Sequence, residues 1–291
     1  MDTRELKNII DNLNNKLAES IYQTIQVLSA IVSMNEKFYI GSHSRFTAEK
    51  SRLVAKALGM DDTEAFETET AALLHDIGKI RFSEHLNSLS SNDMSDGEFF
   101  QYQMHPELGR QLLEIHSGFD SISEIIYQHH EKLDGSGFPG NLRRDSISPA
   151  ARIIAVADSY HNLYAKQKKN NAGGKNPIQV TSSGAYLEST DSRFAGAMNY
   201  LNSKRGILFE SKIVDIFSDI IMAERKNMGK MVVVRVPVNS VKPGMIMAED
   251  YYTTFGLLIA ARGEEISSEM LPPLVRFAEL GEIPHRVLVM K

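Results

Sequence analysis

The sequence carries histidines and aspartates of metal-binding type at five places: His43, the pair His75-Asp76, His105, the pair His129-His130, and Asp158. No cysteine occurs in the chain. Neutral imidazole and carboxylate together suit iron, manganese or zinc in hydrolytic chemistry, whereas closed structural zinc sites commonly use thiolates. The residue types therefore predict a hydrolytic metal centre.

The neighbours of these residues indicate how each is positioned. His75 and Asp76 follow the apolar run AALL and precede Gly78, so we expect them at a helix end, where both can serve one metal and Asp76 can bridge two ions. His105 opens a helix as HPELG. Asp158 lies in the apolar segment RIIAVAD, where a carboxylate is costly to bury unless it is paired or metal-bound.

The composition is that of an ordinary globular protein, with 291 residues, 42% hydrophobic and 24% charged. A formal net charge of -5 gives no sign of a nucleic-acid surface, so we expect no DNA partner. The N-terminus is polar, and no apolar run approaches the ~20 residues of a membrane helix. The absence of cysteine fits a reducing compartment. These features predict a cytoplasmic protein without a membrane partner.

Apolar residues recur at helical spacing over most of the chain. Residues 1–35 predict a long amphipathic helix, which either packs on the core or makes a dimer contact. Within residues 36–228 we expect helices at Ser44–Leu58, Glu64–His75, His105–Ile115, Ile122–His130, Ala150–Tyr164 and Ile207–Lys226. The polar segment Lys166–Pro177 is interpreted as an exposed, mobile loop.

The pattern changes from helix to strand at the end of the chain, in residues 229–291. MVVVRVPV and HRVLVMK predict strands, and MIMAEDYYTTFGLLIAARG predicts two more that are joined around Thr254–Gly256. A short helix is expected at Ser268–Leu280. The predicted fold class is therefore mainly α, with a helical domain followed by a small β-rich accessory domain that serves docking or regulation.

The order of the motifs resembles the HD-GYP family, a branch of the HD phosphohydrolase superfamily. The matching segments are GSHS at 41–44, HDIGK at 75–79, HPELG at 105–109, HHEKLDGSGFP at 129–139 and RIIAVAD at 152–158. The β-rich segment looks like the small domain attached to some members. The resemblance implies a helical HD-type fold and a phosphodiesterase that hydrolyses cyclic di-GMP to pGpG and/or GMP.

The resemblance also implies two sets of metal ligands. The set that matches the ancestral HD site is His43, His75, Asp76 and Asp158. The set that matches a second ion, with Asp76 as the bridge, is His105, His129 and His130. Two divalent ions, iron or manganese, are therefore expected. Such a pair can activate a hydroxide and clamp a phosphoryl oxygen.

Catalytic and substrate-binding residues follow from the same resemblance. Lys79 matches the family lysine near the scissile phosphate, where it would act as a point charge, so Lys79 and Asp76 are the expected catalytic residues. The residues expected to contact substrate together with Lys79 are Gly135, Gly137, Phe138 and Pro139.

Three departures from the family pattern change these expectations. Tyr39 stands where some members carry a glutamate that supports a third metal, so we expect two ions, and His43 can bond to a water or to Asp158 instead. Phe138 replaces a tyrosine and lacks its hydroxyl. After Asp158 the family's basic stretch is missing, and four lysines between 166 and 175 either supply cations from a lid or form a solvated face.

Two alternatives to this enzyme stay open. One is a metal-containing cyclic-dinucleotide-binding or signalling module with little turnover, and the other is an HD hydrolase acting on another cyclic dinucleotide. A homodimer contact or a signalling partner is expected on the N-terminal helix or the β-rich segment. The histidines outside the motifs are expected at the surface or the core edge; they are His85, His116, His161 and His285. His161 lies close to Asp158 on one helix.

Overall fold

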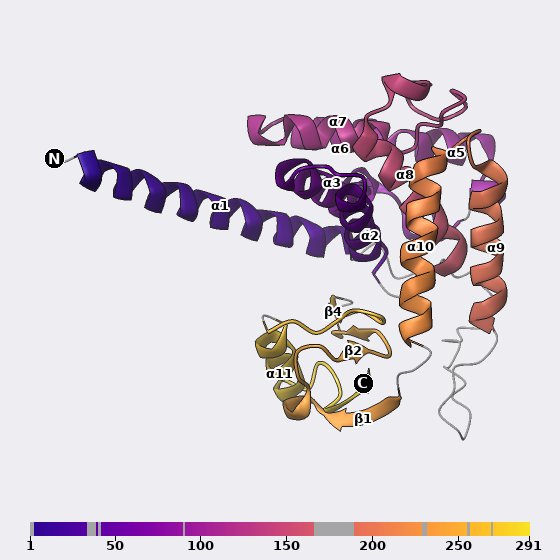
Figure 1. Cartoon of the computed structure of the whole chain (residues 1–291). Coiled ribbons are helices and arrows are strands. Elements are labelled where there is room, and N and C mark those ends of the chain that lie inside the picture. The colour runs from indigo at the N-terminus through magenta and orange to yellow at the C-terminus, as the bar shows by residue number, and fades with distance from the viewer. Residues whose placement is uncertain are drawn as a thin grey trace.

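The computed structural model describes residues 3–33, 39, 42–89, 91–165, 189–228, 232–254, 257–268 and 270–291. These residues form a mainly helical structure with a small amount of antiparallel sheet near the C-terminus (Figure 1), which confirms the predicted fold class. None of the helices in these ranges combines the length and apolar character that crossing a membrane requires. The segment 166–177 lies outside the described residues.

The predicted N-terminal helix is α1 (Thr3–Ser33), which projects from the rest of the molecule (Figure 1). Near its C-terminal end, Ile25 and Val32 are buried in the core. Towards its N-terminus, Leu13 and Leu17 are 59% and 60% exposed. One end of α1 therefore joins the core, while part of its apolar stripe faces solvent.

In the ranges that the structure describes, the helical part after α1 has eight longer helices and several short turns. The longer helices are α2 (His43–Ala57), α3 (Asp62–Leu74), α5 (Asp96–Gln103), α6 (His105–Leu113), α7 (Asp120–Gln128), α8 (Pro149–Ala165), α9 (Ser189–Lys204) and α10 (Ser211–Met228). The short elements are α4 (Glu84–Ser88) and the 3-10 turns η1 (Ile77–Arg81), η2 (Ser91–Asp93), η3 (Ser117–Phe119) and η4 (Arg144–Ser146). All six predicted helices of this part are present, although the last begins at Ser211 rather than Ile207 because residues 207–210 form a turn after α9.

Helix α8 lies between two hydrophobic clusters and is buried on most of its surface. Ile154 belongs to the cluster shared with α1, α3 and α7, whereas Ile153 and Ala157 belong to the cluster shared with α2, α9 and α10. A helix that is apolar all round is expected in such a central position. Asp158 is therefore carried on a rigid element in the middle of the core.

The C-terminal β module (residues 232–291) has its own small core. Its strands are β1 (Val233–Pro237), β2 (Ile246–Met247), β3 (Tyr251–Tyr252), β4 (Leu258–Ala260) and β5 (Arg286–Met290), with the turn η5 (Val238–Ser240) and the helix α11 (Leu271–Glu279). One sheet has the order β1-β5-β2 and the other pairs β3 with β4. Val287 and Val289 of β5 are fully buried, and Leu274 of α11 packs in the same cluster. The strands expected at both ends of the module and the helix are present, but the first of the two strands expected in residues 245–263 is divided into β2 and β3, which belong to different sheets. Residues 255 and 256 of the expected turn lie outside the described residues.

An ion pair in which one nitrogen contacts both carboxylate oxygens joins the β module to the helical part. Arg45 Nη1 donates to the two carboxylate oxygens of Glu264 at 2.7 and 3.0 Å. Glu264 also accepts a hydrogen bond from the backbone N–H of Ala261, so its carboxylate is held within the module. Because Arg45 lies in the first turn of α2, the module contacts the helix that begins with His43.

Candidate metal centre

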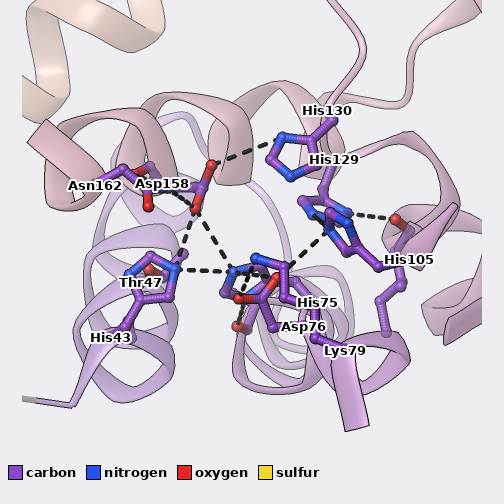
Figure 2. Close-up of polar contacts among 12 residues, drawn as sticks. His43, Thr47, His75, Asp76, Lys79, His105, His129, His130, Asp158 and Asn162 are labelled. Carbon is purple, nitrogen blue, oxygen red and sulfur yellow. Dashed lines mark hydrogen bonds and ion pairs between the residues drawn. The ribbon is translucent and has the colours of Figure 1, made fainter. Parts of the chain in front are cut away.

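The seven predicted metal ligands converge at one place in the helical part (Figure 2). His43 begins α2, His75 follows the last residue of α3, His105 begins α6, His129 follows the last residue of α7, and Asp158 lies within α8. Each of the seven side chains is buried, with at most 8% of any residue exposed. Helix ends thus bring together side chains that are far apart in sequence.

His43, His75 and Asp158 form a first group, whose ligand atoms lie within 4.8 Å of one another. The Nε2 atom of His43 is 3.1 Å from Nε2 of His75 and 3.1 Å from Oδ1 of Asp158. Nε2 of His75 is 3.7 Å from the same oxygen. Two imidazoles and one carboxylate therefore point at a common centre.

His105, His129 and His130 form a second group with the same spacing of ligand atoms. The Nε2 atoms of His105 and His129 are 3.2 Å apart. His130 extends towards the first group, because its Nδ1 lies 3.8 Å from Oδ2 of Asp158. The second group consists of imidazoles alone.

Asp76 lies between the two groups. Its Oδ1 is 3.5 Å from Nε2 of His75 and 3.5 Å from Nε2 of His105. That oxygen is buried and has no hydrogen-bond partner among the described residues. A buried carboxylate oxygen without a partner is rare, and one placed equally far from two histidine groups fits a bridging metal ligand. The donor set, five imidazoles and two carboxylates, suits divalent transition metals.

Three of the histidines are oriented by the backbone. The Nδ1 atoms of His75, His105 and His129 each lie close to the carbonyl oxygen of the residue three positions earlier, at 2.7, 2.6 and 2.5 Å. If each Nδ1–H donates to that carbonyl, the neutral ring carries a free lone pair on Nε2. All three Nε2 atoms face the centre, so the helix ends supply both the position and the tautomer.

The electrostatic environment differs between the groups. Burial alone would lower the pKa of His75, but the carboxylates of Asp76 and Asp158 raise it to about 9. Burial lowers the pKa of His105 and His130 well below the usual range, so these rings are neutral at physiological pH. Metal ligation requires neutral imidazoles, so the second group is ready to bind while His75 must first release a proton.

Lys79 is a buried cation beside Asp76 rather than a solvated lysine at a helix end. It lies in η1 with 9% of its surface exposed, and its Nζ donates to Oδ2 of Asp76 at 2.7 Å. The same ammonium lies 4.9 Å from the centre of the Tyr102 ring. Burial opposes its charge, but Asp76 raises the pKa of Lys79 above the usual range. A permanent positive charge therefore stands next to the two groups.

A sequence model of the HD domain family matches residues 26–189, which is more than half of the chain. The chain belongs to the HD domain family. The resemblance read from the motifs is thereby confirmed.

Two curated relatives are similar to this HD domain protein. A 3'3'-cGAMP-specific phosphodiesterase from Vibrio cholerae is 34% identical over 129 residues, which is 44% of this chain and 28% of the relative. The cyclic di-GMP phosphodiesterase response regulator RpfG from Xanthomonas campestris is 29% identical over 206 residues, which is 69% of this chain and 48% of the relative. The chain thus spans less than half the length of either relative.

Among solved structures, an HDG"Y"P protein from Bdellovibrio bacteriovorus aligns with a TM-score of 0.49 at 22% identity. The alignment covers 62% of this chain and 52% of that chain.

The loop after His130 is held tightly against the second group of this HD domain. The carboxylate of Glu131 accepts backbone N–H bonds from Gly140 and Leu142 at 2.6 and 2.9 Å. A Cβ atom at Gly137 would lie 2.5 Å from the backbone of Glu131, so only glycine fits there. The centre of the Phe138 ring lies 4.6 Å from the centre of the His130 ring.

The other predicted substrate-binding residues lie in this same loop. Gly135 has a φ of 78°, and a Cβ atom there would meet the Arg143 side chain at 2.6 Å. Pro139 follows Phe138 directly. Phe138 also lies 6.0 Å from Tyr102, between ring centres, so that aromatic rings from the loop and from α5 flank the second group.

The prediction for His161 was wrong, and two other residues near the centre, Asn162 and Tyr102, were missed. His161 is 3% exposed, and its Nδ1 is 3.0 Å from Nδ1 of His43. It lies three residues after Asp158 on α8, and Asn162 lies four residues after, so both share the face of the helix that carries the ligand. That spacing was the signal in the sequence. Tyr102, whose ring contacts Lys79, was also missed.

The remaining three histidines outside the motifs lie away from the centre, as expected. His85 is largely exposed beside Glu98, and His285 is exposed. The exposed His116 accepts a hydrogen bond from the backbone N–H of Gly118.

Proposed function

We propose that this HD domain protein is a metal-dependent phosphodiesterase that hydrolyses cyclic di-GMP to pGpG and/or GMP. The observation that carries the proposal is Oδ1 of Asp76, which has no hydrogen-bond partner among the described residues and lies 3.5 Å from a histidine nitrogen of each group. The relatives named as phosphodiesterases of cyclic di-GMP and of 3'3'-cGAMP support the substrate class.

Two divalent ions, iron or manganese, complete the proposed centre. His43, His75 and Asp158 would hold one ion, the second group of histidines would hold the other, and Asp76 would bridge them. Bound there, two such ions would supply a nucleophile at neutral pH and would stabilise the charge on the phosphoryl oxygens. The neutral rings of His105 and His130 favour binding without a proton to displace.

The protein's own groups would orient and stabilise the substrate. Lys79, held by Asp76, would place its ammonium near the phosphoryl group and offset the charge that develops in the transition state. Gly135, Gly137, Phe138 and Pro139 would form one wall of the substrate site. The Phe138 ring beside His130 would limit the access of bulk water to the second group.

Hydrolysis of cyclic di-GMP by the purified full chain tests this proposal. The chain is loaded anaerobically with Fe²⁺ or Mn²⁺, and linear pGpG and GMP are separated chromatographically over time. We expect product with either metal and none after chelation. Metal-loaded protein that leaves cyclic di-GMP intact would contradict the proposal.

Another cyclic dinucleotide is a second candidate substrate, because one of the relatives is specific for 3'3'-cGAMP. A panel of cyclic di-GMP, cyclic di-AMP and 3'3'-cGAMP under equal conditions separates the two candidates by their relative kcat/KM. Tight binding of a cyclic dinucleotide without any product would instead favour a binding or signalling module with little turnover.

The remaining assignments belong to the same proposal. We divide the chain into the N-terminal helix at 1–35, the catalytic domain at 36–228 and the β-rich domain at 229–291.

The exposed Leu13 and Leu17 of α1 offer an apolar face for a second copy or for a signalling protein, and the β module offers another surface. Light scattering of the full chain and of a Leu13→Glu variant tests the first of these contacts. A cytoplasmic location fits the absence of cysteine.

A further inference from the structure

A chain of side-chain hydrogen bonds lies behind the carboxylate of Asp158. The amide Nδ2 of Asn162 donates to Oδ1 of Asp158 at 2.6 Å (Figure 2). The amide oxygen of Asn162 in turn accepts from the Tyr39 hydroxyl at 2.7 Å. Because an ionised carboxylate can only accept, Asp158 fixes which end of Asn162 faces it, and the amide oxygen is left to accept from Tyr39. Oδ1 of Asp158, the oxygen that faces His43 and His75, is therefore held by Asn162, which is in turn held by Tyr39, 123 positions away in the sequence.

The same tyrosine also covers the neighbouring ligand, His43. The two rings are stacked, with centres 4.3 Å apart and planes 16° apart. On its other side, Nδ1 of His43 pairs with Nδ1 of His161 at 3.0 Å, and the His161 ring packs on Phe46. Nε2 of His43 is thereby directed at His75 and Asp158.

We propose that Tyr39, Asn162 and His161 are positioning residues that hold His43 and Asp158 for the first ion and so set the affinity of that ion alone. The inference rests on the proposed two-ion centre. It distinguishes the two groups because His105 and His129 of the second group are oriented by backbone carbonyls, which no substitution removes. Side-chain changes at 39, 161 and 162 should therefore weaken one ion and leave the other unchanged.

Tyr39 stands at the position where some family members carry a glutamate ligand, and here it contacts two proposed ligands instead. Its hydroxyl is used by Asn162 and its ring lies against His43, so the tyrosine acts on two existing ligands. Tyr39 is 6% exposed, so little of this contact is shared with solvent. Residues that orient a ligand in this way commonly change metal affinity by about 10- to 100-fold when they are replaced.

Titration of the metal-free full chain with Mn²⁺, followed by calorimetry, tests the proposal. Wild type is expected to bind two ions. In Asn162→Ala one affinity should fall by about 10- to 100-fold while the other stays unchanged. Tyr39→Phe removes one oxygen and keeps the stacked ring, so it should cause a smaller loss at the same ion. The double variant Tyr39→Phe/Asn162→Ala should bind the first ion as weakly as Asn162→Ala alone, because the hydrogen bond between residues 39 and 162 is already absent in the single variant.

Two controls make the outcome decisive. The control variant Tyr164→Phe removes the hydroxyl of a tyrosine on α8, one turn after Tyr160. Tyr164 stacks on Tyr160 and contacts none of the ligands described, so both affinities should stay at the wild-type values. Thermal unfolding with chelator present verifies that each variant is folded. Wild-type affinities in Asn162→Ala, or equal weakening of both ions, would overturn the inference. Two ions bound by a wild type that cleaves no cyclic dinucleotide would contradict only the proposed function.

Discussion

The two groups of proposed ligands in this HD domain differ in how some members are oriented, although His75 of the first group is held by the backbone carbonyl of Ala72. In the second group, His105 and His129 are fixed by backbone carbonyls at helix ends. In the first group, His43 and Asp158 are fixed by the side chains of His161 and Asn162. Backbone carbonyls therefore orient much of the second group and His75, whereas His43 and Asp158 depend on side chains that can vary independently of the fold.

The groups also differ in charge. The first contains a carboxylate, and the pKa of His75 is raised to about 9 by Asp76 and Asp158 against the effect of burial. The second contains only imidazoles, and burial keeps them neutral. A metal ion should thus replace a proton in the first group and enter a neutral site in the second.

Removing one ligand from each group should have the largest effect. Asp158→Ala and His105→Ala should each leave one bound ion and lower kcat/KM by more than about 1,000-fold, beyond the typical loss of a single stabilising donor. Metal analysis after dialysis, together with product formation, checks both variants. If either variant keeps two ions, its residue is not a ligand, and the division into groups is wrong.

Lys79→Ala should have the next largest effect, because the ammonium belongs to neither group. Loss of the buried charge should lower kcat by about 100- to 1,000-fold while two ions stay bound. Steady-state kinetics with metal analysis of the same sample measures both quantities. An equal loss of metal would show that Lys79 acts by holding Asp76 rather than by stabilising the reacting phosphate.

The helix ends at which several proposed ligands lie could be predicted from local patterns in the sequence, whereas the ligand set itself came from the family resemblance. His75 and Asp76 precede Gly78, and His105 precedes a helix-starting proline. Helix α5 was missed although its capping box at Ser95 and Glu98 is visible in the sequence. Helix α9 was also missed; much of the chain before it is polar and rich in glycine.

The contacts that orient the first group could not be predicted, because they are formed between distant segments. Tyr39 meets Asn162 only after α2 has packed against α8. The ion pair between Arg45 and Glu264 likewise depends on where the β module docks. Hydrogen bonds of this kind have no periodicity in the sequence, so the structure was needed to find them.

The close approach of η1 to α6 joins the two groups, and Gly78 makes it possible. A Cβ atom at this residue would lie 2.0 Å from the carbonyl oxygen of His105. Gly78→Ala should therefore destabilise the fold by about 1–3 kcal/mol and separate Asp76 from the second group. Gly97→Ala is the matched control, since no atom lies within 4 Å of its added Cβ. Chemical denaturation measures both, and equal stability of the two variants would contradict this role.

The pH dependence of metal affinity should differ between the two groups in the wild-type protein, without any substitution. Because a proton on His75 competes with the metal, affinity for the first ion should rise about tenfold per pH unit up to about pH 9. The neutral rings of His105 and His130 predict no such slope for the second ion. Mn²⁺ titrations between pH 6.5 and 9 check this difference, and parallel slopes would contradict it.

The central proposal is that Asp76 would bridge two ions that would together promote cleavage of the substrate. Metal content and pGpG formation, measured together on wild type and Asp76→Ala, test it most directly. Wild type should hold two ions and form pGpG, whereas Asp76→Ala should lose bound metal and all product. Product formed at the wild-type rate without Asp76 would contradict the claim.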